Sequence, residues 1–265
     1  MNKTELLDKY ARDGESRLLL ARVLDQQQRA DQRGIPTHTA FLSPAEQAMS
    51  ADLLMAAAPG QGVLHGGYAD AERKLWGFLP DWLDEDLWLA GEDCPLAALE
   101  VNTPKGAKLT HRDYLGSLMG LGITREKIGD ILIGETGAQV IVLRETLPIL
   151  LAQWEKAGRY PVTLTPLPLD QLTPTPGETK EVRATVASVR LDAVVSAGFS
   201  IPRSRAADLI RGGRVMVNHR PCEKADKVVE AGDVLTCRGL GKCVLTEIGG
   251  TSKRGRTILT IQRYL

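Results

Sequence analysis

The spacing of apolar positions changes along the chain, and the predicted secondary structure changes with it. Over residues 4–30, apolar residues recur among charged ones with the period of one helix face. Ser43-Pro44 with Glu46 marks the start of a further helix, because the serine oxygen and the glutamate carboxylate can each bind a free backbone amide. Two short apolar runs that follow predict strands. Residues 1–84 are therefore expected to form a helical and α+β region.

Residues 85–165 have the pattern of a ferredoxin-like domain. Strand-like and helix-like segments follow one another in the order βαββαβ, with the strands expected at 96–101, 128–133, 138–143 and 160–164. The same order is found in the common RNA-recognition module, which stacks bases on aromatic side chains of its sheet. The expected strands carry almost no aromatic residues, so RNA binding by the sheet itself is not favoured.

A proline- and threonine-rich stretch at 166–181 is expected to be a stiff, extended linker, because proline can continue neither a helix nor a central strand. The charge changes sign there. Residues 182–265 hold 15 basic and 7 acidic residues, whereas the preceding 181 hold 18 basic and 26 acidic. A basic C-terminal domain on an acidic body indicates a polyanionic partner for that domain alone. The chain as a whole is α+β.

Two short amphipathic helices, each ended by glycine, begin this C-terminal domain. The first buries Leu191, Val194 and Val195 and is expected to end at Gly198. The second exposes several arginines. Arginine suits double-stranded RNA, whose shape and phosphates are read more easily than its bases, because the guanidinium stays charged and binds phosphate through paired N–H groups. The candidate RNA-binding residues are Arg190, Arg203, Ser204, Arg205, Arg211, Arg214, Asn218, His219, Arg220, Lys242, Lys253, Arg254 and Arg256.

A few polar and charged residues outside this domain are also considered as RNA contacts. Arg125 and Lys127 are possible secondary RNA contacts on the acidic body. His65, Tyr68 and Arg73 are expected to pack and satisfy a glycine-rich turn rather than to face RNA.

Catalytic chemistry is not indicated. Arg190-Leu191-Asp192 matches the catalytic tripeptide of pseudouridine synthases, but those enzymes build a large domain around their aspartate, so Asp192 is expected to pair locally. The sequence contains no GxSxG, HExxH or GxGxxG motif. The four cysteines form no CxxC pair, so no metal and no cofactor are expected. A polar N-terminus and the lack of a long apolar run favour a cytoplasmic protein without membrane contact.

The C-terminal segments RLDAVVSAG, RSRAADLIRGGRVMVN and VVEAGDVLTCRGLGK resemble the alpha-L RNA-binding domain, which is named for the fourth protein of the small ribosomal subunit. In that resemblance Arg190, Arg203, Arg205, Arg211, Arg214 and Asn218 fall on the RNA-facing pattern. Where relatives commonly have serine before the first arginine of the second helix, this chain has Pro202.

The whole chain resembles the YlmH-type family, which includes photosystem II alpha-L-domain relatives, through FLSPAEQ, HGGYADAERKL, LAALEVN and TREKIGDILI. The resemblance implies a bacterial cytoplasmic RNA-binding protein without enzymatic activity. Its implied targets are ribosomal RNA and tRNA on the large ribosomal subunit, in ribosome-associated quality control. A monomer is favoured.

Two other functions remain open from the sequence. One is an RNA-modification enzyme or its accessory, because alpha-L domains often accompany pseudouridine synthases and methyltransferases. The other is a protein–protein adaptor in cell division, in which RNA binding is incidental.

Overall fold

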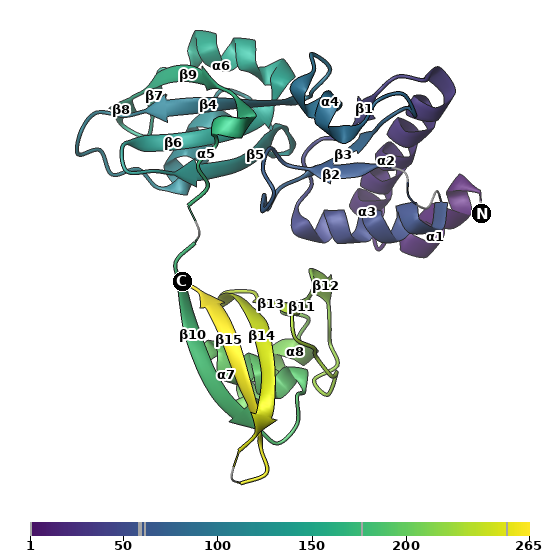
Figure 1. The fold of residues 1–265 in the computed structure, drawn as a ribbon, viewed down its shortest axis with the longest axis vertical. Coiled ribbons are helices and arrows are strands. Elements are labelled where there is room, and N and C mark those ends of the chain that lie inside the picture. The colour runs from purple at the N-terminus through teal and green to yellow at the C-terminus, as the bar shows by residue number, and fades with distance from the viewer. Residues whose placement is uncertain (1, 58–59, 61, 176, 253) are drawn as a thin grey trace. The chain divides into compact units, whose positions relative to one another are not determined.

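The computed structural model describes residues 2–57, 60, 62–175, 177–252 and 254–265. The chain divides into two compact units, Met1–Thr175 (unit 1) and Pro176–Leu265 (unit 2), which are described separately (Figure 1). No helix among the described residues is long and apolar enough to cross a membrane.

Unit 1 begins with three helices that pack beside a small sheet (Figure 1). The helical pattern over 4–30 is divided into two helices, because Asp13 accepts a hydrogen bond from the Ser16 amide and starts a new one. The helix start at Ser43 is confirmed: the Ser43 amide donates to Glu46 Oε2 at 2.6 Å. The elements are α1 (Lys3–Tyr10), α2 (Gly14–Arg33), β1 (Thr37–His38), α3 (Pro44–Ala57), β2 (Val63–His65), β3 (Leu75–Phe78) and α4 (Glu85–Ala90), with sheet order β1-β3-β2.

The middle of the chain confirms the βαββαβ order. Its four strands form an antiparallel sheet in the order β5-β6-β4-β9, as in ferredoxin-like domains. The elements are β4 (Leu96–Asn102), α5 (His111–Gly120), η1 (Arg125–Lys127), β5 (Ile128–Ile133), β6 (Gly137–Leu143), η2 (Arg144–Thr146), α6 (Leu147–Gln153), β9 (Thr163–Leu167) and η3 (Leu169–Gln171).

One feature of this domain was not predicted. A hairpin of two very short strands, β7 (Lys156–Ala157) and β8 (Tyr160–Pro161), lies between α6 and β9. The expected last strand at 160–164 therefore starts three residues later, at Thr163. Strands of two residues contain no complete alternation of apolar and polar positions, so the sequence pattern gives no signal for them.

Both faces of this sheet are covered. Val140 and Val142 of β6 pack under α5 and α6, whereas Ile141 and Leu143 point the other way. The second pair joins a cluster with Phe41, Leu75 and Trp88 from the N-terminal part. All four β6 side chains are buried. The face on which an RNA-recognition module stacks bases is thus occupied by the protein's own N-terminal region.

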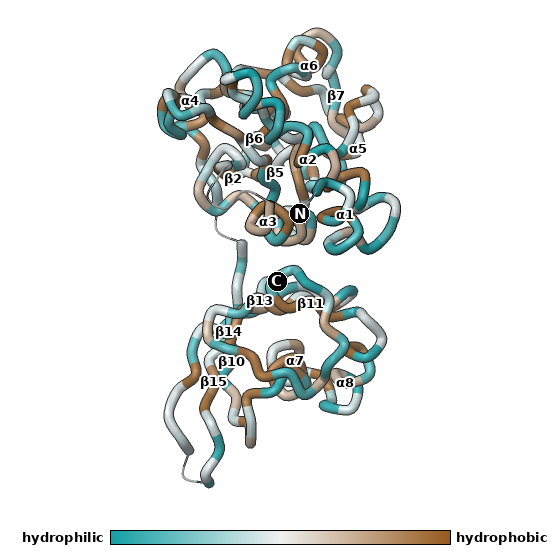
Figure 2. Tube along the Cα trace, turned by 90° about the vertical axis from the view of Figure 1, so that its right-hand side faces the viewer, coloured by the Kyte–Doolittle hydropathy of each residue, from teal (hydrophilic) through white to brown (hydrophobic). Residues whose placement is uncertain are grey.

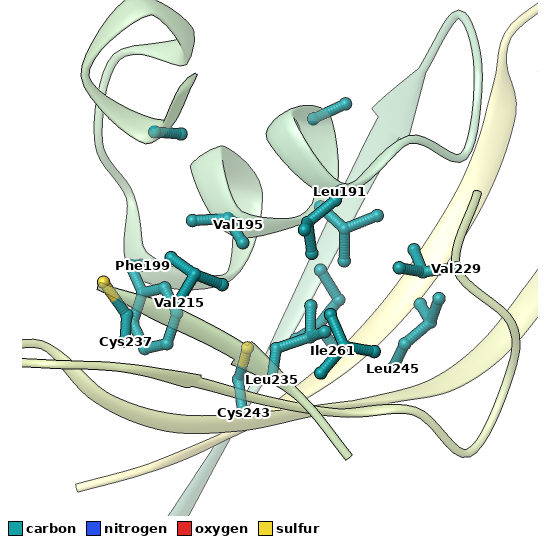
Figure 3. Close-up of a cluster of buried hydrophobic side chains, with 14 of the residues drawn as sticks. Leu191, Val195, Phe199, Val215, Val229, Leu235, Cys237, Cys243, Leu245 and Ile261 are labelled. Atoms are coloured by element: carbon teal, nitrogen blue, oxygen red, sulfur yellow. The ribbon is translucent and has the colours of Figure 1, made fainter. Parts of the chain in front are cut away.

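Unit 2 packs two helices on a six-stranded sheet of order β10-β15-β14-β13-β11-β12. Its core joins apolar residues of α7 to the sheet, including Leu191, Val195, Leu235 and Ile261 (Figure 3). Along its length α7 is mainly hydrophobic, whereas α8 carries more hydrophilic positions (Figure 2). The elements are β10 (Thr179–Val186), α7 (Leu191–Phe199), α8 (Arg203–Arg211), β11 (Val215–Val217), β12 (Arg220–Pro221), β13 (Val234–Cys237), β14 (Gly241–Thr251) and β15 (Thr257–Tyr264).

Two predicted boundaries are corrected. Helix α7 does not end at Gly198 but continues to Phe199, and Ser200 takes the left-handed conformation at φ 54°. Gly198 is buried against the sheet, where an added Cβ would lie 2.9 Å from Cys243 Sγ, so it permits close helix–sheet packing. The expected linker 166–181 is also shorter, because β9 extends to Leu167 and β10 begins at Thr179.

Candidate RNA-binding surface

The arginines at the start of the two helices of unit 2 are organised by one carboxylate. Asp192, in the first turn of α7, is 7% exposed. Arg203 donates to it from Nε at 2.9 Å and from Nη2 at 3.1 Å, and Arg190 Nε lies 3.7 Å from the same carboxylate. The hydrogen bonds to Asp192 raise the pKa of Arg203. The expected local pairing of Asp192 is therefore confirmed, with two predicted RNA-binding residues as its partners.

Helix α8 presents its basic residues on the exposed side. Ala206 and Ile210 are buried, while Ser204, Arg205 and Arg211 are exposed. Arg211 Nη1 lies 3.0 Å from Asp208 Oδ1, but both side chains are mostly exposed, so the pair stabilises the fold little.

The first turn of α8 contributes no acidic residue of its own to its N-terminus. Pro202 occupies the cap position without a side-chain hydrogen bond. The positive end of the helix dipole therefore adds to the charge of the arginines there.

Arg214 lies close to the same region. Burial raises the pKa of the Cys237 thiol, and the nearby charges of Arg214 and Arg205 act in the opposite direction. The Arg214 amide donates to the Leu209 carbonyl of α8 at 3.0 Å, which places Arg214, just before β11, next to that helix. We call the set Arg190, Arg203, Arg205, Arg211 and Arg214 the arginine surface.

In the turn after β11, the side chain of Asn218 forms hydrogen bonds with other residues of unit 2. Asn218 and His219 have φ values of 49° and 64° and connect β11 to β12, as in a two-residue hairpin turn. Asn218 Nδ2 donates to Asp233 Oδ1 at 2.7 Å, and its Oδ1 accepts from the Val234 amide at 2.9 Å. Asn218 thus holds the turn against β13. Arg220, the residue after the turn, is exposed.

The remaining candidates of unit 2 belong to β14 and to the loop that follows it. Lys242 Nζ stacks 4.1 Å from the centre of the Tyr264 ring. The basic loop between β14 and β15 lies at the end of a hairpin that extends past the helices (Figure 1). There Arg254 is exposed and Arg256 Nη2 donates to the Thr185 carbonyl at 2.8 Å. Lys253 lies outside the described residues.

The two secondary candidates on unit 1 have partners within the unit. Arg125 Nη1 donates to the carbonyls of Ile128 and Gly129 at 2.7 and 3.2 Å, and burial lowers the pKa of Arg125 to about 10. Lys127 Nζ lies 2.8 Å from Glu145 Oε1. Both side chains hold the turn that enters β5.

A polar network that the sequence did not predict joins this turn to the N-terminal part. Asp130 accepts hydrogen bonds from the Tyr68 hydroxyl at 2.9 Å and from the amides of Glu72 and Arg73 at 2.7 and 3.0 Å. Tyr68 and Arg73 therefore pack and satisfy the glycine-rich turn, as expected. Asp130 was missed because a lone acidic residue inside a strand pattern gives no sign of a distant partner.

This chain resembles known protein families over most of its length. Three family models match: "YlmH, N-terminal" at residues 15–77, "Putative RNA-binding domain in YlmH" at 90–171, and "S4 domain" at 189–235. The last range contains the whole arginine surface.

A curated relative, "Ribosome-associated protein quality control protein P2" of Bacillus subtilis (strain 168), is 36% identical over 231 residues, covering 85% of this chain and 86% of the relative. A solved structure, "Cell division protein ylmH from Streptococcus pneumoniae", is 24% identical with a TM-score of 0.49, covering 60% of this chain and 94% of that chain.

Proposed function

We propose that this chain, which belongs to the YlmH family, binds structured RNA through the arginine surface of unit 2. The observation that carries the proposal is the double hydrogen bond between Arg203 and Asp192, which fixes a half-exposed guanidinium in one orientation. A fixed guanidinium loses less side-chain entropy when it binds a phosphate than a free one does. The exposed Arg205 and Arg211 beside it extend the same positive surface.

This surface suits the backbone of an RNA helix. Each arginine can donate paired N–H groups to phosphate oxygens, and the charge does not depend on cellular pH. Base edges are not needed, because double-stranded RNA is recognised mainly by its shape and its phosphates. We therefore propose a structured, helical RNA as the ligand.

The ribosome is the proposed location. The relative's name associates it with ribosomes and with protein quality control. By this relationship we propose ribosomal RNA or tRNA on the large ribosomal subunit as the target, in ribosome-associated quality control within the cytoplasm.

The proposal assigns no chemical step to the chain. Asp192, the residue that the sequence placed in a catalytic-like tripeptide, has its carboxylate bound by Arg203 and Arg190. A modification reaction is tested by incubating large-subunit RNA with the purified chain, with and without S-adenosylmethionine, and analysing the nucleosides by mass spectrometry. A modified nucleoside formed only with the chain would contradict a purely binding role.

Co-sedimentation with purified large ribosomal subunits tests the proposal. The variant R205E/R211E is expected to lose binding, because neither side chain holds the core of unit 2. The matched control K180E/R183E makes the same charge change on exposed positions of β10 and is expected to bind like the wild type. Equal behaviour of the two variants would contradict the proposal.

A further inference from the structure

A second basic surface lies on the middle domain of unit 1. It is formed by two segments, 103–112 and 156–160, which contain five exposed cations and no acidic residue. The whole of residues 1–175 holds 17 basic and 24 acidic residues, so these cations stand out from an acidic unit. We call Lys105, Lys108, Arg112, Lys156 and Arg159 the hairpin patch.

The two segments are packed together. The β7–β8 hairpin pairs Ala157 with Tyr160, and its turn contains Gly158 at φ 55°. A Cβ on Gly158 would lie 3.3 Å from Leu109 Cδ2 and 3.6 Å from Asp113 Oδ1, so the turn lies against the start of α5. Figure 1 shows the β7–β8 hairpin at one end of the four-stranded sheet. Cations on both segments therefore share one region of the surface.

Two acidic residues, Asp113 and the exposed Glu155, border the two segments, and in the described part of the chain neither forms an ion pair with the five cations. Asp113 Oδ2 accepts hydrogen bonds from the amide and the hydroxyl of Thr110, both at 2.7 Å, which caps α5. Among the described residues, none of the five cations forms an ion pair with a carboxylate. Arg125 and Lys127 differ in this respect, because they have partners within the fold. The hairpin patch is thus open to an external anion.

An aromatic ring completes the surface. Arg159 lies 5.0 Å from the centre of the Tyr160 ring, and its Nη2 donates to the Tyr160 hydroxyl at 2.9 Å. Tyr160 is half-buried. Cations around a partly exposed aromatic residue are a combination that binds single-stranded nucleic acid, with phosphates on the cations and a base on the ring.

We propose that the hairpin patch is a second RNA-binding surface of this chain, which takes an unpaired RNA segment. The sheet face that binds bases in RNA-recognition modules is covered here by the N-terminal region. The hairpin patch would provide the RNA contact of this domain instead. The inference rests on the proposed function in one respect: the chain must bind RNA.

The test measures the affinity of the full chain for purified large ribosomal subunits and for protein-free RNA extracted from them, at several salt concentrations. The variant K108E/R159E is expected to bind both about tenfold more weakly, with a log–log salt slope reduced by about 1.4 units, because two phosphate contacts to an unpaired strand are lost, at about 0.7 each. The control R29E/R33E makes the same charge change on exposed positions of α2 and is expected to leave both quantities unchanged.

Three results would overturn the inference. Equal effects of the two variants would mean that only net charge matters. Weaker binding of K108E/R159E to intact subunits, with unchanged binding to protein-free RNA, would assign the patch to an acidic protein instead. Loss of binding in R205E/R211E alone would refute the patch and leave the proposed function intact. A wild-type affinity that is indifferent to salt would refute the proposed function itself.

Discussion

Arg203 Nε donates a hydrogen bond to Asp192 Oδ2 at 2.9 Å, and its Nη2 donates to Oδ1 at 3.1 Å. The Asp192 side chain is 10% exposed and that of Arg203 is 51% exposed. The pair therefore connects a buried anchor to a guanidinium that reaches solvent. A buried carboxylate is tolerated only when it is paired, so the same contact stabilises the start of α7 and orients an RNA-binding group.

Replacing Arg203 by Lys keeps the charge but removes the paired geometry, since an ammonium cannot bind both carboxylate oxygens as a planar fork. RNA affinity is expected to fall about 3- to 10-fold, because a flexible side chain costs about 0.5–1.5 kcal/mol to immobilise. The salt slope should stay unchanged. Fluorescence anisotropy with a labelled RNA hairpin measures both quantities. The control is Arg211→Lys, because the exposed ion pair with Asp208 restrains the Arg211 side chain less. A loss of RNA affinity in Arg211→Lys as large as that in Arg203→Lys would argue against preorganisation of Arg203.

Removal of the Asp208 carboxylate should strengthen RNA binding. Asp208 competes with phosphate for Arg211, and such an exposed pair is worth about 0.2–1 kcal/mol, so Asp208→Ala is expected to raise the affinity up to about fivefold. Glu181→Ala makes the same charge change and frees Arg183 on β10, away from the arginine surface. Its affinity should remain that of the wild type. A gain of equal size in both variants would show a nonspecific charge effect.

Asn218→Gly separates a structural from an RNA-binding role of the turn. Glycine accepts the positive φ, but two hydrogen bonds, to Asp233 and from Val234, are lost. Unit 2 should lose about 1–3 kcal/mol of stability, which hydrogen exchange of the β11 and β13 amides reports. RNA affinity under folding conditions should be unchanged. Weaker RNA binding with unchanged exchange rates would instead assign Asn218 to the RNA contact.

Arg125→Ala tests the secondary candidate on unit 1. The Gly129 carbonyl loses its side-chain donor, while the Ile128 carbonyl keeps the hydrogen bond from Arg73 Nε at 3.0 Å, so the unit should be destabilised by about 1–3 kcal/mol while RNA affinity is retained. All four tryptophans belong to residues 1–175, so their fluorescence during urea unfolding follows unit 1 alone. Lys127→Ala, which breaks one exposed ion pair, should cost less than about 1 kcal/mol. Loss of RNA affinity by Arg125→Ala without destabilisation would contradict this assignment.

The sequence predicts the order of elements well where the apolar pattern is long enough to have a period. The alternation at 138–143 and the stripe of Leu191, Val194 and Val195 each identify an element correctly. Both features are local: the α7 stripe faces the core of unit 2, and the alternation in β6 sends successive side chains to the two faces of its sheet. The β7–β8 hairpin escaped prediction because its strands have two residues each.

The residue types of the candidate site could be predicted from the sequence, but the contacts between them could not. Arginines near α8 follow from the sequence, and so does local pairing of Asp192. The sequence does not show that Asn218 donates a hydrogen bond to Asp233, or that Arg125 donates one to the Ile128 carbonyl, because these contacts depend on the folded structure. The covered sheet face of the middle domain depends likewise on Phe41 and Leu75, which lie outside this domain in the sequence.

The salt dependence of RNA affinity tests the central claim most directly. If the five arginines of the arginine surface contact phosphates, the log of the affinity of the full chain for large-subunit RNA should fall linearly with the log of salt concentration. These five contacts account for a slope of about −4, since each contact contributes about −0.7 to −0.9. In R205E/R211E the slope should be smaller in magnitude by about 1.4 to 1.8 units, because two of these contacts are lost. A wild-type affinity that does not change with salt would contradict RNA binding through this surface.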